Sequence, residues 1–229
     1  MPQGEPDVLP FPGGLNFTPN GLLVFSAASS ALFLYMLRAP ASLRRAAVKT
    51  FAIALLALIA IAMHGPALLI AALILSAVGD FLLALENENS FQAGLGSFLL
   101  AQIILVGLFS SHFGSDMLWA AEPWRIYLAI AAAAHSAVLI WILVRRLPPN
   151  LTAQIGAYGV VITFMALAAL AFAPHMAVMG AALFYVSDTL IAYERFLLKT
   201  EVNQHPLISP LVWVTYYLAQ TLIMLGVLM

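Results

Sequence analysis

The chain has 229 residues, of which 63% are hydrophobic and only 8% are charged, and its formal net charge is −1. Soluble domains carry roughly 25% charged residues, so this composition excludes a protein that covers its surface in water and indicates an integral membrane protein. Cysteine is absent, which excludes disulfides and thiol chemistry. No basic stripe is long enough to favour nucleic acid as a partner.

Residues 1–20 are rich in proline and hold no Lys or Arg, so we expect an extramembrane tail rather than a cleaved signal peptide. Eight apolar runs follow, each close to the ~20 residues that cross a bilayer core. They cover about 21–38, 46–63, 66–85, 91–111, 125–144, 151–172, 175–193 and 207–228. No sustained alternation predicts a strand. We therefore predict one all-α domain, 21–229, with eight transmembrane helices.

The positive charges predict the orientation of these helices. Only Arg125 falls on one side of the predicted bundle. The other eight basic residues fall on the opposite side: Arg38, Arg44, Arg45, Lys49, Arg145, Arg146, Arg195 and Lys199. By the positive-inside rule these eight face the cytoplasm, so both termini face out. The compact loops favour a bacterial inner membrane.

Two of the predicted helices carry an aspartate in similar surroundings. Residues 75–85 read LSAVGDFLLAL and residues 183–193 read LFYVSDTLIAY, so Asp80 matches Asp188. The sequence LAQ recurs at 100–102 and 218–220. We predict two parallel four-helix repeats, about 21–113 and 125–229, with the two aspartates as symmetry mates.

Both aspartates lie inside the predicted membrane. The next acid, Glu86 or Glu194, follows six residues later, which places each aspartate about 9 Å from the cytoplasmic end of its helix. A carboxylate in hydrocarbon is costly, so both acids should face the bundle interior or a wet cavity. A polar cluster that only locks helix packing would explain one such acid, whereas two at matched depth favour a functional site.

Other polar side chains fall at the same level and complete an expected pocket. Its wall and mouth residues are Lys49, Tyr158, Tyr185, Arg195, Tyr216 and Gln220. Such a pocket suits an amphiphile, whose chain would lie among apolar side chains. An anionic head group would meet Lys49, Arg195 or the basic first loop at the inner leaflet.

Several motifs resemble the YhhN-like family of membrane proteins, which includes lysoplasmalogenases, enzymes that cleave the vinyl ether bond of lysoplasmalogens. The motifs are GDFLLAL, FQAGLGSFLLAQ, AYGVVITFM, GAALFYVSDTLIAYERF and VTYYLAQTLIMLG, and the resemblance runs from about Lys49 to the C-terminus. It implies a lysophospholipid substrate, with Asp80 and Asp188 as the family's acidic pair. Lys49, Tyr158, Tyr216 and Gln220 match positions that the family keeps polar.

The fourth predicted helix departs from the family pattern. Where that pattern has His followed three residues later by Tyr, this chain has Gln102 and Leu105. We include Gln102 among the substrate-binding residues. The departure leaves open a weaker activity, another substrate, or a lipid-binding protein without activity.

Vinyl ether hydrolysis begins with protonation on carbon, which an aspartate pair can provide when one acid keeps its proton and the other stays ionised. The sequence does not indicate which aspartate is which. This chemistry requires no cofactor or metal. His64, His112 and His175 lie with Asp116 at the outer helix ends, in separate loops that do not favour a zinc site.

The sequence also admits a proton-coupled transporter of a small amphiphile, because acids at a repeat interface are common in such carriers. A transporter should show broken helices at corresponding positions. Proline is absent next to either aspartate, so the sequence does not predict such breaks.

Overall fold

The structure, a computed structural model, describes residues 9–85, 87–112, 118–119, 121–198 and 206–229. Glu86, Asp116 and Lys199 lie outside these described residues. Throughout the described ranges the regular structure is helical and no strand occurs. A short 3₁₀ turn, Gly14–Asn16, and a π-helix, η2 (Tyr193–Leu197), accompany eight α-helices. These are α1 (Thr18–Met36), α2 (Leu43–Ala62), α3 (Ala67–Leu83), α4 (Glu88–His112), α5 (Trp124–Arg146), α6 (Pro149–Phe172), α7 (His175–Ala192) and α8 (Ile208–Leu228).

The helices have the surface of a membrane protein. In the described part of the chain, seven of them are long and apolar enough to span a bilayer, and α3 is a shorter apolar helix of 17 residues. Large apolar side chains such as Phe25, Ile130 and Met179 are exposed, as expected of side chains that lipid covers. The all-α membrane protein is confirmed, whereas the eighth span, the repeat and the side of the termini stay predictions.

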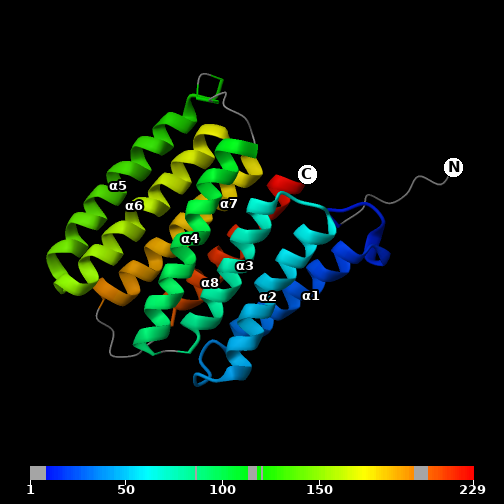
Figure 1. The fold of residues 1–229 in the computed structure, drawn as a ribbon, viewed down its shortest axis with the longest axis horizontal. Helices are drawn as coiled ribbons and strands as arrows, with labels where there is room; N and C mark the ends of the chain where they lie inside the picture. Colours follow the sequence, from blue (N-terminus) through cyan, green and yellow to red (C-terminus); the bar gives the residue numbers. More distant parts are fainter. Residues whose placement is uncertain (1–8, 86, 113–117, 120, 199–205) are drawn as a thin grey trace.

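The two halves of the chain meet through their fourth helices. Within each half, consecutive helices pack against one another, and α5 lies at one edge of the bundle against α6 (Figure 1). Between the halves, α4 packs on α6, and α8 packs on α2 while also reaching α1 and α3. Each half therefore packs its fourth helix against the second helix of the other half. This arrangement leaves α3 and α7 facing the same interior.

Helices α7 and α8 approach closely because small residues occupy their contact. A Cβ added at Gly180 would lie 2.7 Å from the Ile223 backbone nitrogen and 2.8 Å from the Ala219 carbonyl oxygen. A Cβ at Gly226 would lie 2.6 Å from the Ala177 nitrogen. Since backbone atoms cannot move aside as a flexible side chain does, only glycine permits this spacing.

We expect Gly180→Ala to destabilise the protein by about 1–3 kcal/mol, because the added methyl group overpacks a contact made of backbone. Thermal unfolding in detergent measures this loss. The matched control is Gly156→Ala on α6, where an added Cβ meets nothing within 4 Å. That control should unfold at or slightly above the wild-type temperature, since Ala is the better helix former. Equal stability of wild type and Gly180→Ala would contradict the close approach of α7 and α8.

Two features near the N-terminus differ from the prediction: the start of α2 and the packing of the tail. Helix α2 begins at Leu43, earlier than residue 46, because the Ser42 side chain accepts a hydrogen bond from the Arg45 backbone N–H and caps the helix. Arg45 therefore belongs to the first turn of α2 and Lys49 to the second. Part of the predicted tail also packs on the bundle, since the Asn20 side chain bonds both the backbone N–H and the C=O of buried Phe11.

Candidate functional site

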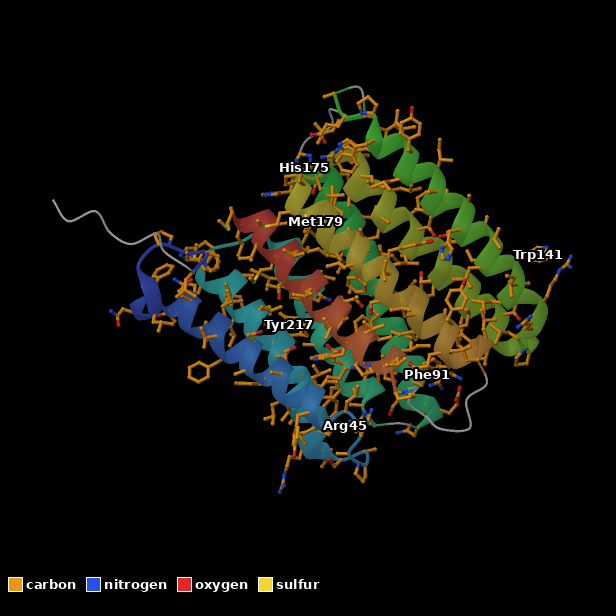
Figure 2. All side chains as sticks on the ribbon, turned by 180° about the vertical axis from the view of Figure 1, so that it is seen from behind. Arg45, Phe91, Trp141, His175, Met179 and Tyr217 are labelled. Carbon is orange, nitrogen blue, oxygen red and sulfur yellow. The ribbon has the colours of Figure 1, made fainter. Side chains whose placement is uncertain are left out.

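A cavity of about 610 Å³ lies at the end of the bundle that carries Arg45 and Phe91, opposite the end with His175 (Figure 2). Its lining comes from α1 to α4, α6, α7, η2 and α8. Both predicted acids, Asp80 and Asp188, belong to that lining. The volume lies within the ~300–1,000 Å³ that is usual for small-molecule sites.

Asp80, on α3, is the more deeply buried acid and is held by a cation. Its side chain is 1% exposed, and the Lys49 ammonium on α2 lies 3.0 Å from Oδ1 as an ion pair. The Tyr216 hydroxyl on α8 donates a 2.6 Å hydrogen bond to Oδ2. A buried charge is tolerated when it is paired and hydrogen-bonded, and Asp80 meets both conditions.

Asp188, on α7, is held by neutral groups. The Tyr158 hydroxyl on α6 donates to Oδ2 at 2.6 Å, and the Gln102 amide on α4 donates to the same oxygen at 2.7 Å. That amide also donates to the Tyr158 hydroxyl at 2.9 Å, which closes the triangle. Among the described residues, none donates to the other carboxyl oxygen, Oδ1. Asp188 itself is part of the cavity lining.

The two acids have partners from equivalent places in the two halves. Asp80 is contacted by the second helix of its own half and the fourth helix of the other half, α2 and α8. Asp188 is contacted in the same way by α6 and α4. The helix positions match, but the chemistry does not, because a lysine stands beside one acid where a tyrosine stands beside the other.

The glycine that precedes Asp80 has a packing role at the cavity floor. A Cβ at Gly79 would lie 2.6 Å from the ring of Phe98, so only glycine lets this ring pack against α3. The Phe98 ring in turn meets Tyr216 edge-on, with centroids 5.7 Å apart. The Phe98 ring thus packs against the tyrosine that bonds Asp80, and this packing explains the glycine in the GD pair of the sequence.

Charged residues surround the cavity mouth. Arg45 and Lys49 lie over the ring of Phe33, at 5.7 and 5.8 Å from its centroid. The end of α7 continues into η2, a wider helical turn of the kind that often occurs at functional sites. This turn places Glu194 and Arg195 in the lining, with the Arg195 guanidinium 3.5 Å from the centroid of Phe91. The Ser209 hydroxyl donates a hydrogen bond to Glu194.

Of the residues predicted for the pocket, six belong to the cavity lining: Lys49, Asp80, Tyr158, Asp188, Arg195 and Tyr216. Gln102 and Gln220 are fully buried behind it. Gln102 supports Asp188, whereas the Gln220 amide donates to the Ser76 hydroxyl at 2.9 Å. Leu105 is buried in the apolar core.

Tyr185 lies in a separate polar cluster away from the cavity. Its hydroxyl is 2.7 Å from His135 Nδ1 and 2.7 Å from the Ser136 hydroxyl, both on α5. Tyr185 precedes Asp188 by three residues, which is slightly less than one helical turn. The two side chains therefore leave α7 in different directions, and Tyr185 faces α5. Helical spacing alone grouped the two residues, and it did not predict which neighbouring helix each one meets.

Sequence reasoning did not identify Glu88, Glu194 and Ser209 as lining residues, and it placed Arg45 in a loop. The cap at Ser42 was the signal that could have moved Arg45 into α2. The other three lie beyond the apolar runs, or at their ends, where hydropathy distinguishes poorly between a pocket rim and a solvated loop.

The end of the bundle opposite the cavity holds a separate polar cluster. The Arg125 side chain is 1% exposed and donates to the Leu170 and Ala173 carbonyls at the end of α6. Its hydrogen bond to Glu122 holds the pKa of that carboxyl below its ordinary value. His175 lies 2.9 Å from the same carboxylate. Across the described residues there is no group of three or more potential ligands that could hold a metal ion.

Comparison with known proteins gives one family match and two named relatives. A family model described as the YhhN family matches residues 44–227. Proteins named "Lysoplasmalogenase" from Mycobacterium bovis and from Mycobacterium tuberculosis are each 34% identical over 164 residues, covering 69% of this chain. The chain spans 59% of the length of these relatives. No solved structure matches the chain.

Proposed function

Because the chain belongs to the YhhN family, we propose that it hydrolyses the vinyl ether bond of a lysoplasmalogen-like lysophospholipid to a fatty aldehyde and a glycerophospho-alcohol. The observation that carries the proposal is one cavity lined by two aspartates with unequal partners. The relatives named as lysoplasmalogenases support the substrate class. The bilayer supplies such a substrate directly to a site between membrane-spanning helices.

We assign the proton donor to Asp188. Its Oδ2 accepts hydrogen bonds from Tyr158 and Gln102, both neutral donors. If the carboxyl is protonated, Oδ2 serves as its carbonyl oxygen and Oδ1 carries the proton. Asp188 belongs to the cavity lining, so a substrate bound in the cavity can bring its alkene carbon to this proton. Gln102 is a positioning residue in this scheme, since it contacts the acid and not the cavity.

Asp80 supplies the fixed negative charge. The ammonium of Lys49, 3.0 Å away, and the Tyr216 hydroxyl both favour the ionised form of this carboxyl. Its charge favours the cationic intermediate that forms in the same cavity, and the interaction is stronger for a buried carboxylate than for one in water. The two aspartates thus have different environments and different roles.

The reaction runs in three steps with balanced protons. Asp188 donates its proton to the alkene carbon remote from the ether oxygen, and the adjacent carbon becomes an oxocarbenium ion. Water adds to that carbon and returns a proton to the Asp188 carboxylate, which gives a hemiacetal. The hemiacetal then collapses: its hydroxyl gives up a proton as the carbonyl forms, the C–O bond to glycerol breaks, the glycerol oxygen takes up a proton in exchange, and a fatty aldehyde leaves.

The test uses the purified full chain in detergent and measures aldehyde release from a 1-alkenyl lysophospholipid. The control substrate is the 1-alkyl analogue, which lacks the double bond and therefore cannot be protonated on carbon. We expect aldehyde from the alkenyl lipid only. Absence of aldehyde from both lipids, with the protein folded, would refute the hydrolase.

A second candidate is a lipid-binding protein without activity, which the glutamine at position 102 favours, since the family pattern expects a histidine there. Saturable binding of the alkenyl lipid without aldehyde release would support it. Helices α3 and α7 run unbroken through Asp80 and Asp188. Many carriers have broken helices at their ion and substrate sites, so these unbroken helices do not favour a transporter.

A further inference from the structure

The side of the cavity next to α6 belongs to a small hydrophobic cluster. The lining residues of this cluster are Leu95 on α4, Ile155 on α6, Ala192 on α7 and Phe196 on η2. The cluster is separate from the main core of the described residues. On the side formed by α1, α2 and α8, by contrast, the Lys49 ammonium lies over the rings of Phe33 and Trp213. A hydrocarbon chain in the cavity is therefore better accommodated next to α6.

A narrow apolar void lies between α5 and α6, which run side by side (Figure 1). It is too narrow to admit a water molecule. The one hydroxyl in its lining belongs to Thr152 and donates to the Pro148 carbonyl at 3.0 Å, so no free polar group of this side chain faces the void. The lining residues are Ile140, Leu143, Val144, Leu147, Thr152, Ile155 and Gly156.

Ile155 separates this void from the cavity that holds the aspartates. Of the described residues, it alone lines both spaces, and its side chain is 8% exposed. It precedes Tyr158, the tyrosine that donates to Asp188, by three residues, or slightly less than one helical turn. An apolar chain that extends from Asp188 along α6 therefore meets Ile155 before it can reach the void.

The void has a closed end and an open space beside Ile155. At Gly159 an added Cβ would lie 2.9 Å from Cγ1 of Ile140, so α5 and α6 are in close contact at this level. At Gly156, three residues earlier, an added Cβ would meet nothing within 4 Å. The helices thus separate next to Ile155 and close again at Gly159, which gives the void a limited capacity.

We propose, on the basis of the proposed function, that Ile155 limits the length of the alkenyl chain that this protein accepts. The reacting double bond must reach Asp188, so the rest of the chain has to fit in the space that remains in the cavity. A chain that is too long presses on Ile155, and overpacking of this kind is unfavourable. Shortening the Ile155 side chain joins the cavity to the void between α5 and α6, which then receives the end of a longer chain.

The experiment measures kcat/KM for aldehyde release with 1-alkenyl lysolipids that differ only in chain length. Each lipid is presented at the same mole fraction in detergent micelles, so that all variants meet the same substrate concentration. For the wild type we expect kcat/KM to fall about tenfold beyond a limiting length, the effect of moderate overpacking. In Ile155→Ala this fall should occur only with longer chains. Ile155→Val, which removes a single methyl group, should give a smaller shift in the same direction.

Two further variants test the role of the void. In Ile155→Ala/Gly156→Leu the leucine fills the void, so the fall in kcat/KM should return to the wild-type length. Gly156→Leu alone should keep the wild-type profile, because Gly156 lies outside the lining of the aspartate cavity. The matched control is Ile162→Ala, the same change on the same helix, at a residue that is 6% exposed in the main core and lines neither space. It should also keep the wild-type profile.

The same dependence on chain length in wild type, Ile155→Ala and Ile155→Val would overturn the inference. So would a shift that persists in the double variant or that also occurs in Ile162→Ala. Equilibrium binding of the 1-alkyl analogues separates this result from failure of the hydrolase. If no lipid yields aldehyde, the hydrolase is refuted, and the binding series decides the role of Ile155. A longer limiting length for binding in Ile155→Ala supports it, and an unchanged length overturns it.

Discussion

Asp188→Asn is expected to lower aldehyde release by ~10²–10⁴-fold, the usual contribution of a positioned general acid. The amide has the shape of the carboxyl group, and its oxygen can still accept the hydrogen bonds from Tyr158 and Gln102. The fold should therefore persist while the transferable proton is lost. Initial rates with the 1-alkenyl lysolipid at saturating concentration measure the effect on kcat.

Two comparisons make this result specific to Asp188. Tyr217→Phe removes a hydroxyl that bonds Ser26 outside the cavity lining, and it should keep wild-type kcat. Tyr158→Phe removes one donor to Asp188 while leaving Gln102 in place, so its loss of kcat should be smaller than that of Asp188→Asn. Wild-type kcat in Asp188→Asn would exclude Asp188 as the proton donor.

Lys49→Met is expected to cause a large loss of stability. Asp80 is 1% exposed, and the Lys49 ammonium is the cation that lies beside it. Removing one partner of a buried ion pair leaves an uncompensated charge, which costs about 3–5 kcal/mol. Methionine retains the length and apolar character of the lysine stem, so the loss reports on the charge. The midpoint of thermal unfolding in detergent gives the measurement.

The double variant Lys49→Met/Asp80→Asn tests the cause. It removes both charges and keeps a side chain that can accept the Tyr216 hydrogen bond, so most of the stability lost in Lys49→Met should return. Its kcat should stay low, because the negative charge that favours the oxocarbenium ion is absent. A double variant as unstable as Lys49→Met would show that packing, and not the unpaired carboxylate, accounts for the loss.

The local features of this protein were predictable from its sequence. Hydropathy located the eight α-helices of the described residues, because a segment of about 20 apolar residues is recognisable without knowledge of its neighbours. The repeated surroundings of Asp80 and Asp188 identified the two acids, and the motifs indicated the family that the match over residues 44–227 confirms. Each of these inferences depends on residues close together in the chain.

Only the tertiary structure decided which side chains meet. Tyr216 donates to Asp80 across 136 residues of sequence and Gln102 to Asp188 across 86, and no helical period predicts such pairs. The rotation of α7 directs Tyr185 toward α5 although it lies one turn from Asp188. Lys49 lies beside Asp80 and no lysine lies beside Asp188 among the described residues, so two acids with similar sequence surroundings have different environments. Contacts between helices depend on the packing of whole faces, and that packing is fixed by side chains distributed over the entire chain.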